Sequence, residues 1–165
     1  MSKKRLHITI FDGSLKTTTF INRLIEGLST HHEVYVFGFT ENLQHAIPGV
    51  RYVALGSAAA KLRLMQLGVV FAFKALFTLG SLSLFLKSLA LLIRFRKKAL
   101  QQHHFNIAIA LHRPDILHVQ WPSLLPWCES ALQDPAVRVV LSQRGYQNNV
   151  RPFLDEANKN YLAQV

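Results

Sequence analysis

The chain reads PDILHVQWPSLLPWCESALQDPAVRVVLSQRG over residues 114–145, and this segment contains two apolar runs that each end in polar residues. The runs, residues 115–119 and 137–141, have the length and apolar character of buried strands. Polar, aromatic and glycine residues mark their ends: His118, Gln120 and Trp121 in the first, then Ser142, Gln143, Arg144 and Gly145 in the second. In an open α/β sheet, ligands bind outside the carboxyl ends of the strands, so these groups indicate a binding site.

Strands and helices alternate along the rest of the chain. Further strands are predicted at residues 6–11, 34–39 and 50–55, and helical spacing of apolar residues between 20 and 28 predicts a helix between the first two. The order predicts one domain over residues 1–165, in which a Rossmann-like parallel sheet of the α/β class carries helices on both faces.

The composition narrows the class of protein. Half of the 165 residues are hydrophobic, which suffices for a substantial core. The net charge of +10 favours anionic partners such as bilayers, nucleic acids or sugar phosphates. A nucleic-acid partner is not expected, because the chain has no recognisable nucleic-acid motif. The single cysteine, Cys128, indicates a reducing compartment, and the lack of a signal-peptide pattern supports a cytoplasmic location.

An apolar region at about residues 58–99 allows three interpretations. A membrane span is disfavoured, because Lys74 divides the apolar run into pieces too short to cross a bilayer. Gly80, Ser81 and Ser83 instead predict a break between two helices within residues 62–93. These are either ordinary crossover helices or a surface that lies on an anionic membrane. An amphipathic pattern favours the membrane interpretation: one helical face carries Leu82, Phe85, Leu89 and Leu92, whereas another carries Lys87, Arg94 and Lys98.

The motifs of this chain resemble those of the acceptor-side domain of retaining, GT-B fold glycosyltransferases of family 4. Asp115, Ile116, His118 and Trp121 stand in a "PDIxHxxW" strand, and Ser142, Arg144, Gly145, Asn149 and Pro152 match an "S-x-R-G-x-x-x-N-x-x-P" pattern. His32, Glu33 and Val34 are similar to the "HEV" second strand of that family. The resemblance covers nearly the whole chain, although each motif is short.

The resemblance implies an enzyme of hexosyltransferase type that moves a sugar from a nucleotide-sugar donor to a hydroxyl acceptor, either lipid-linked or a polysaccharide. It implies catalytic roles for His118 and Arg144, and donor or acceptor contacts for Asp12, Gly13, Ser14, Gln120, Trp121, Gln143, Gly145 and Asn149. In that family, a second Rossmann-like domain with a basic residue and an E-x7-E motif binds the donor. That domain is absent from these residues, so we expect the chain to be inactive alone. The alternative is a non-enzymatic membrane-associated module that uses basic amphipathic helices.

The residues themselves leave several roles open. His118 suits either a ligand contact or a hydrogen-bonded place in the core, since Leu117 and Val119 face the other way. Trp121 could stack on a sugar ring or pack around the next helix. Arg144 could bind a phosphate with two hydrogen bonds or pair with Asp155 or Glu156.

The predicted loop at residues 12–17 follows a strand and precedes a helix, so it could hold an anion. It is not a P-loop, because Leu15 stands where that motif requires the glycine directly before the lysine. A helix cap by Thr17 or Thr18 explains the loop equally well.

No metal or cofactor is expected. His31–His32 and His103–His104 are adjacent pairs, predicted at loop or helix ends, and they lack cysteine or carboxylate partners at ligand spacing.

Overall fold

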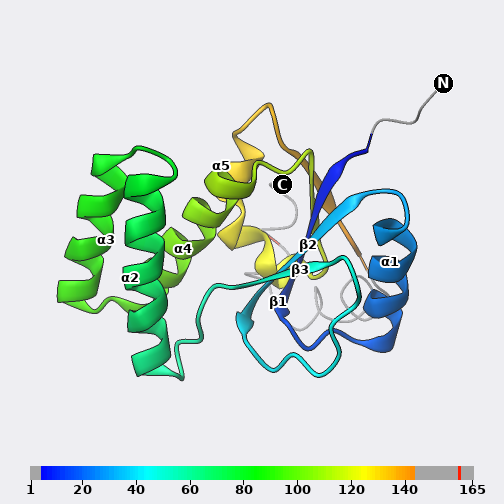
Figure 1. The fold of residues 1–165 in the computed structure, drawn as a ribbon, viewed down its shortest axis with the longest axis horizontal. Coiled ribbons are helices and arrows are strands. Elements are labelled where there is room, and N and C mark those ends of the chain that lie inside the picture. The colour runs from blue at the N-terminus through cyan, green and yellow to red at the C-terminus, as the bar shows by residue number, and fades with distance from the viewer. Residues whose placement is uncertain (1–4, 144–159, 161–165) are drawn as a thin grey trace.

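The computed structural model describes residues 5–143 and Asn160, and within them a five-stranded parallel sheet. The sheet has the order β3-β2-β1-β4-β5, the arrangement of a Rossmann-like α/β fold, which confirms the predicted fold class (Figure 1). The elements are β1 (His7–Ser14), α1 (Thr19–Ser29), β2 (Glu33–Thr40), β3 (Arg51–Ala54), α2 (Lys61–Phe77), α3 (Leu82–Arg94), α4 (Lys97–His112), β4 (Ile116–Val119), the 3-10 helix η1 (Pro122–Trp127), α5 (Glu129–Leu132) and β5 (Arg138–Leu141).

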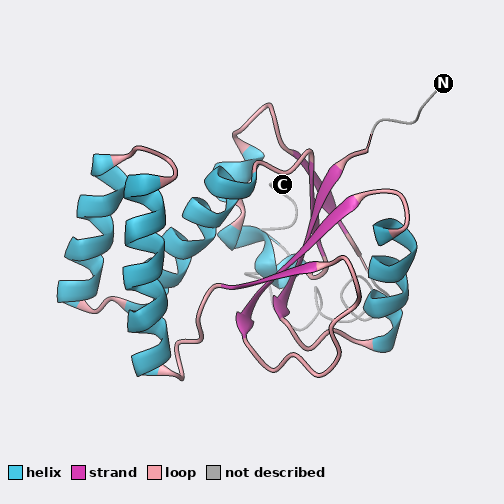
Figure 2. Cartoon of the chain, in the orientation of Figure 1, coloured by secondary structure: helices cyan, strands magenta, loops and turns pink. Residues whose placement is uncertain are grey.

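Helices lie on both faces of the sheet, as predicted (Figure 2). Alternate residues of a strand point to opposite faces, so Ile8 and Ile10 of β1 pack with Ile21 and Ile25 of α1. The other face packs against α4, η1 and α5. Each face therefore has its own apolar cluster, and β1 contributes to both.

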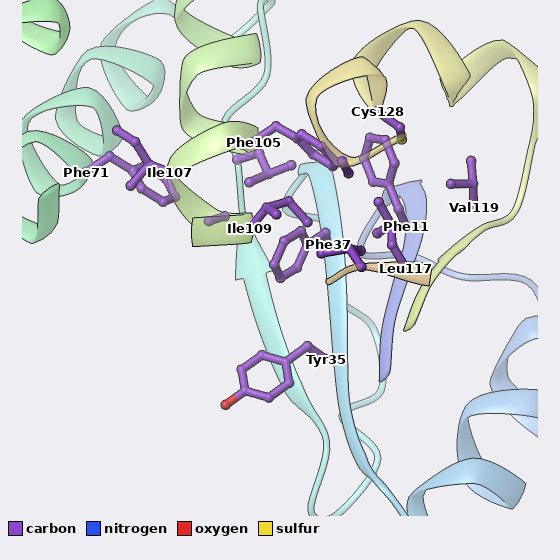
Figure 3. Close-up of a cluster of buried hydrophobic side chains, with 14 of the residues drawn as sticks. Phe11, Tyr35, Phe37, Phe71, Phe105, Ile107, Ile109, Leu117, Val119 and Cys128 are labelled. Carbon is purple, nitrogen blue, oxygen red and sulfur yellow. The ribbon is translucent and has the colours of Figure 1, made fainter. Parts of the chain in front are cut away.

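The larger cluster joins the sheet to α4. Phe11 and Phe37 face Phe105 of this helix, and the ring centroids of Phe11 and Phe105 are 4.8 Å apart (Figure 3). Leu117 and Val119 of β4 extend the cluster toward Cys128 and are fully buried. Burial of these side chains away from water is the main stabilising contribution to such a fold.

Two of the predicted boundaries need correction. β1 continues to Ser14, so Asp12, Gly13 and Ser14 belong to a strand and not to a free loop. The strand was expected to end at Phe11 because polar residues follow, but the backbone of Gly13 and Ser14 still pairs with β2. His103 and His104 lie within α4 and not at its end, and both side chains are buried.

The apolar region forms two helices with a break at Gly80, as predicted. Gly80 has a φ of 63°, which favours glycine, and the Ser81 side chain caps α3 by accepting a hydrogen bond from the Leu84 backbone. None of the described helices combines the length and apolar character that crossing a bilayer requires.

The expected amphipathic pattern of α3 is partly wrong. Phe85 and Leu92 are half-buried, and Leu92 lies against Gly68 of α2. Lys98 belongs to α4, because Phe95 ends α3 with a left-handed backbone conformation (φ 43°).

Polar side chains of α4 connect the sheet to the two helices. His104 Nδ1 lies 2.8 Å from the carbonyl oxygen of Leu55, just after β3, and the His104 ring stacks on Phe71 of α2. His103 Nε2 lies 2.9 Å from Ser88 Oγ of α3. Gln101 Nε2 donates to the Gly56 carbonyl at 2.7 Å. These buried hydrogen bonds hold α2 and α3 in place beside the sheet.

We predict that the protein loses stability as the pH falls from 6.5 to about 4. Burial lowers the pKa of His104 from 6.5 to about 4, so the unfolded chain takes up a proton in this range while the folded chain does not. The stabilisation is therefore complete above pH 6.5 and is lost on acidification. His104 alone accounts for on the order of 3 kcal/mol of unfolding free energy.

The measurement is urea unfolding at a series of pH values. His104→Gln should lower the unfolding free energy at neutral pH but weaken its dependence on pH. The exposed His31 provides the matched control, His31→Gln, which should leave that dependence unchanged. Equal pH dependence in wild-type protein and His104→Gln would contradict the prediction.

Candidate functional site

The candidate site lies at the carboxyl edge of the sheet, where β1, β4 and β5 end side by side. The chain leaves β1 toward β2 on one side and reaches β4 on the other, so the edge between β1 and β4 is the topological switch point. Both strand ends are held in register: the Gln120 backbone N–H donates to the Phe11 carbonyl at 2.9 Å, and that of Ser142 donates to the Val119 carbonyl at 2.9 Å. The described residues of the expected site therefore lie along one edge of the sheet.

A β-bulge at the end of β1 determines the orientation of the Asp12 side chain. Phe11 pairs with Phe37 and Gly13 with Gly38, so Asp12 is an extra residue of a β-bulge. Gly13 has a φ of 78°, a conformation that glycine adopts without strain. Such bulges reorient a side chain near the end of a strand.

Gly38 of β2 allows this bulge, although it was not among the site residues predicted from the sequence. A Cβ at this position would lie 2.6 Å from the backbone nitrogen of Leu15 and 2.6 Å from the carbonyl carbon of Ser14. No side chain other than hydrogen fits there without moving the backbone of the bulge. A glycine between two phenylalanines inside a predicted strand was the available signal, because such a glycine often marks a bulge or a close backbone approach.

Asp12 and Trp121 form the central contact of the site. Trp121 Nε1 donates a hydrogen bond to Asp12 Oδ1 at 2.5 Å, and this bond links the end of β1 to the segment after β4. The Trp121 ring also packs against the apolar cluster beneath α1. Both described contacts use the indole for packing and cross-linking, so stacking of Trp121 on a sugar remains a prediction.

His118 lies on the face of the sheet that carries α1, opposite to Leu117 and Val119, as predicted. It is half-buried, and its Nε2 lies 2.8 Å from Ser142 Oγ, just after β5. His118 pairs in register with Val140, two residues before Ser142, so both side chains belong to the same face. The imidazole is thereby oriented by a hydroxyl group, a feature that suits either a structural or a proton-transferring histidine.

The two glutamines of the expected site differ in exposure. The Gln120 side chain is fully buried, whereas Gln143 is exposed. Gln120 is therefore suited to supporting the edge from inside, and Gln143 is the more accessible of the two. The other expected contacts, Arg144, Gly145 and Asn149, lie outside the described residues.

The segment after β1 forms the rim of the same edge. The Lys16 backbone N–H donates to Ser14 Oγ at 3.1 Å, and Thr17 Oγ1 donates to Asn22 Oδ1. Thr18 occupies the cap position of α1, but its side chain makes no capping hydrogen bond. A cavity of about 40 Å³ lies here between Lys16, Thr17 and the segment after β2.

A larger cavity, of about 610 Å³, lies at the opposite edge of the sheet. Its lining includes Arg113 and Pro114 before β4, Asp134 and Ala136 before β5, Leu79 in the turn after α2, and Leu84 of α3. No local sequence pattern indicates this cavity, because its walls come from four separate segments. It lies where β4 and β5 begin, whereas Asp12 and Trp121 lie where β1 and β4 end, and it is bounded by both apolar and charged groups.

The described residues offer neither a metal cluster nor an activated thiol. No group of three or more histidine, cysteine, aspartate or glutamate side chains among residues 5–143 could hold a metal ion. Burial raises the pKa of Cys128 to about 12, and its Sγ donates to the Leu124 carbonyl at 3.5 Å. Cys128 is therefore a protonated core residue and not a nucleophile.

Comparison of the chain with protein-family models, with curated proteins and with solved structures found no match.

We predict that Asp12 and Trp121 are energetically coupled. Trp121→Phe keeps an aromatic ring in the apolar cluster but removes the indole N–H, and Asp12→Ala removes its acceptor. Each substitution should cost about 1 to 3 kcal/mol of unfolding free energy, because the remaining polar partner loses a charge-assisted hydrogen bond.

A double-mutant cycle measured by urea unfolding tests this coupling. The double variant should be less destabilised than the sum of the single variants by about 1 kcal/mol or more. Additive effects would mean that the two side chains act independently.

Proposed function

We propose that this chain is the acceptor-side domain of a retaining, GT-B type glycosyltransferase related to family 4. The complete enzyme would move a sugar from a nucleotide donor to a hydroxyl acceptor. The observation that supports this proposal most is that two hydrogen-bonded pairs, Asp12–Trp121 and His118–Ser142, lie along the edge of a parallel sheet that contains the switch point. A switch-point crevice is the place where domains of this class bind ligands.

The chemistry of these groups suits a carbohydrate hydroxyl. A carboxylate, an imidazole and a hydroxyl group can each exchange hydrogen bonds with a sugar, and Gln143 adds an exposed amide. His118 has Ser142 as an orienting neighbour, so its ring can be held in one direction toward an acceptor. In the proposed enzyme, His118 would contact the acceptor or the reacting sugar and would shuttle or stabilise a proton there.

The family resemblance implies different roles for the two domains of the complete enzyme. Stabilisation of the departing diphosphate would fall to a second Rossmann-like domain, because the described edge carries few positive groups beyond Lys16. The edge described here would position the acceptor. Arg144, which the resemblance also implicates, lies outside the described residues.

The coding sequence beyond Val165 provides the first test of this proposal. We expect it to encode a second Rossmann-like domain with a basic residue and an E-x7-E pair. Such a domain would complete the nucleotide-sugar site, whereas a stop codon directly after Val165 would contradict an enzymatic role for this product.

Turnover of a nucleotide sugar by the complete gene product provides the second test. His118→Ala should lower kcat by about 100-fold or more, because loss of a proton-transferring or acceptor-orienting group has effects of this size. The matched control is His31→Ala, which makes the same change at an exposed position after α1 and should leave turnover unchanged.

Thermal unfolding of the same variants separates function from structure. A functional role predicts that His118→Ala loses activity while retaining its unfolding midpoint. Unchanged turnover would reject the role, and a large loss of stability with a proportionate loss of activity would assign His118 to the core.

A further inference from the structure

The exposed apolar side chains of the protein are concentrated on two helices. Ten of the fourteen large hydrophobic residues that are exposed in the described chain belong to α2 and α3. These helices form an antiparallel pair at one end of the molecule, beside α4 (Figure 1). We call their exposed apolar side chains the hairpin surface. Its apolar area requires an explanation, because exposed apolar patches on soluble domains commonly mark interaction sites.

The α3 part of this surface is a regular stripe. Ser88, on the inner side of the helix, is buried against His103 of α4. The outer side carries four exposed residues at spacings of four, three and four, which places them on one helical face: Leu82, Leu86, Leu89 and Ile93. Ile93 is 85% exposed, so the stripe is not covered by another part of the described chain.

The α2 part adjoins this stripe. Its inner side, including Leu67 and Phe71, is buried in the apolar cluster that α2 shares with the sheet and α4. Its outer side exposes Leu62, Met65, Val69, Val70, Phe73 and Phe77. The Phe73 ring contacts that of Phe85 of α3 at 6.1 Å between centroids, so the exposed sides of the two helices meet.

The charged residues of α2 and α3 all have the same sign. No aspartate or glutamate occurs between Glu41 and Asp115, whereas ten lysines and arginines do. Lys87 and Arg94 are seven residues apart and therefore form a line along α3 beside the apolar stripe. Apolar residues bordered only by cations are the pattern of helices that lie in the interface of anionic membranes.

The cations are most concentrated at one end of the helix pair. Gly68 lies against Leu92 and Phe73 contacts Phe85, so the start of α2 lies beside the end of α3. This end carries Lys61, Arg63, Arg94, Arg96, Lys97 and Lys98. Arg63 is paired with Glu41 at 2.8 Å, and the others add positive charge that anionic headgroups would neutralise.

We propose that the hairpin surface docks the protein onto the headgroup region of an anionic phospholipid bilayer. The apolar side chains of α2 and α3 enter the interface, and the flanking lysines and arginines contact the headgroups. A second copy of the chain fits less well, because joining two such surfaces would bring cations together without any acidic residue from α2 or α3 to pair with them. This inference does not depend on the proposed glycosyl transfer.

Sedimentation of the 165-residue chain with lipid vesicles tests the proposal. The chain should bind vesicles of equimolar phosphatidylcholine and phosphatidylglycerol, and it should bind pure phosphatidylcholine at least about tenfold more weakly. Binding to the mixed vesicles should weaken as salt is added. Failure to bind the mixed vesicles would overturn the proposal.

A matched pair of variants separates docking by this surface from attraction by net charge. Leu86→Glu and Leu132→Glu change the charge equally at exposed leucines, but only Leu86 belongs to the hairpin surface. Leu86→Glu should weaken binding by about tenfold or more, because it places a carboxylate where apolar contact and anionic lipid meet. Leu132→Glu, on α5, should bind nearly as the wild type does.

Further results distinguish docking on a bilayer from unspecific attraction, from self-association and from unfolding of the variant. Equal weakening by both variants would overturn the proposal in favour of unspecific electrostatic attraction. Self-association without lipid that Leu86→Glu abolishes, together with no vesicle binding, would assign the surface to a second copy. If circular dichroism shows that Leu86→Glu is unfolded, Ile93→Glu takes its place, since Ile93 is more exposed and its substitution disturbs the packing less.

Discussion

The fold depends on β1, because the backbone of this interior strand must form hydrogen bonds along both of its edges. β1 pairs in parallel with β2 on one side and with β4 on the other, and it contributes side chains to the buried clusters on both faces. A parallel strand in this position cannot be satisfied by local hairpins and requires crossover connections. The long connection between β3 and β4 supplies one of them, and it also contains the helices that distinguish this protein.

The crossover between β3 and β4 is held by polar contacts as much as by apolar ones. Gln101, His103 and His104 are buried in α4 and reach two other parts of the chain: Leu55 and Gly56 just after β3, and Ser88 of α3. Buried polar groups of this kind specify one arrangement, because moving either partner leaves an unsatisfied group. The same arrangement leaves the outer sides of α2 and α3 without cover from the described chain.

The candidate site is also a consequence of β1. The bulge at Asp12 turns this carboxylate toward Trp121, while the parallel register places His118 next to Ser142. One edge of the sheet therefore collects groups from three strands that are up to 130 residues apart (12 to 142). The proposed acceptor site and the hairpin surface are distinct features, and each has its own physical basis: hydrogen-bonding groups at strand ends in the first case, and exposed apolar helix faces bordered by cations in the second.

The amino-acid sequence by itself determined the five strands, the helix after the first strand and the break at Gly80, because alternation, helical spacing and glycine are local signals. It also indicated that His118 faces away from Leu117 and Val119, since strand periodicity alone decides this. It did not reveal that β1 continues through Asp12 to Ser14, that Gly38 admits the bulge, or that His103 and His104 are buried within α4. Those features depend on which backbone lies opposite each residue, and only the tertiary structure decided them because the contacting groups come from distant parts of the chain.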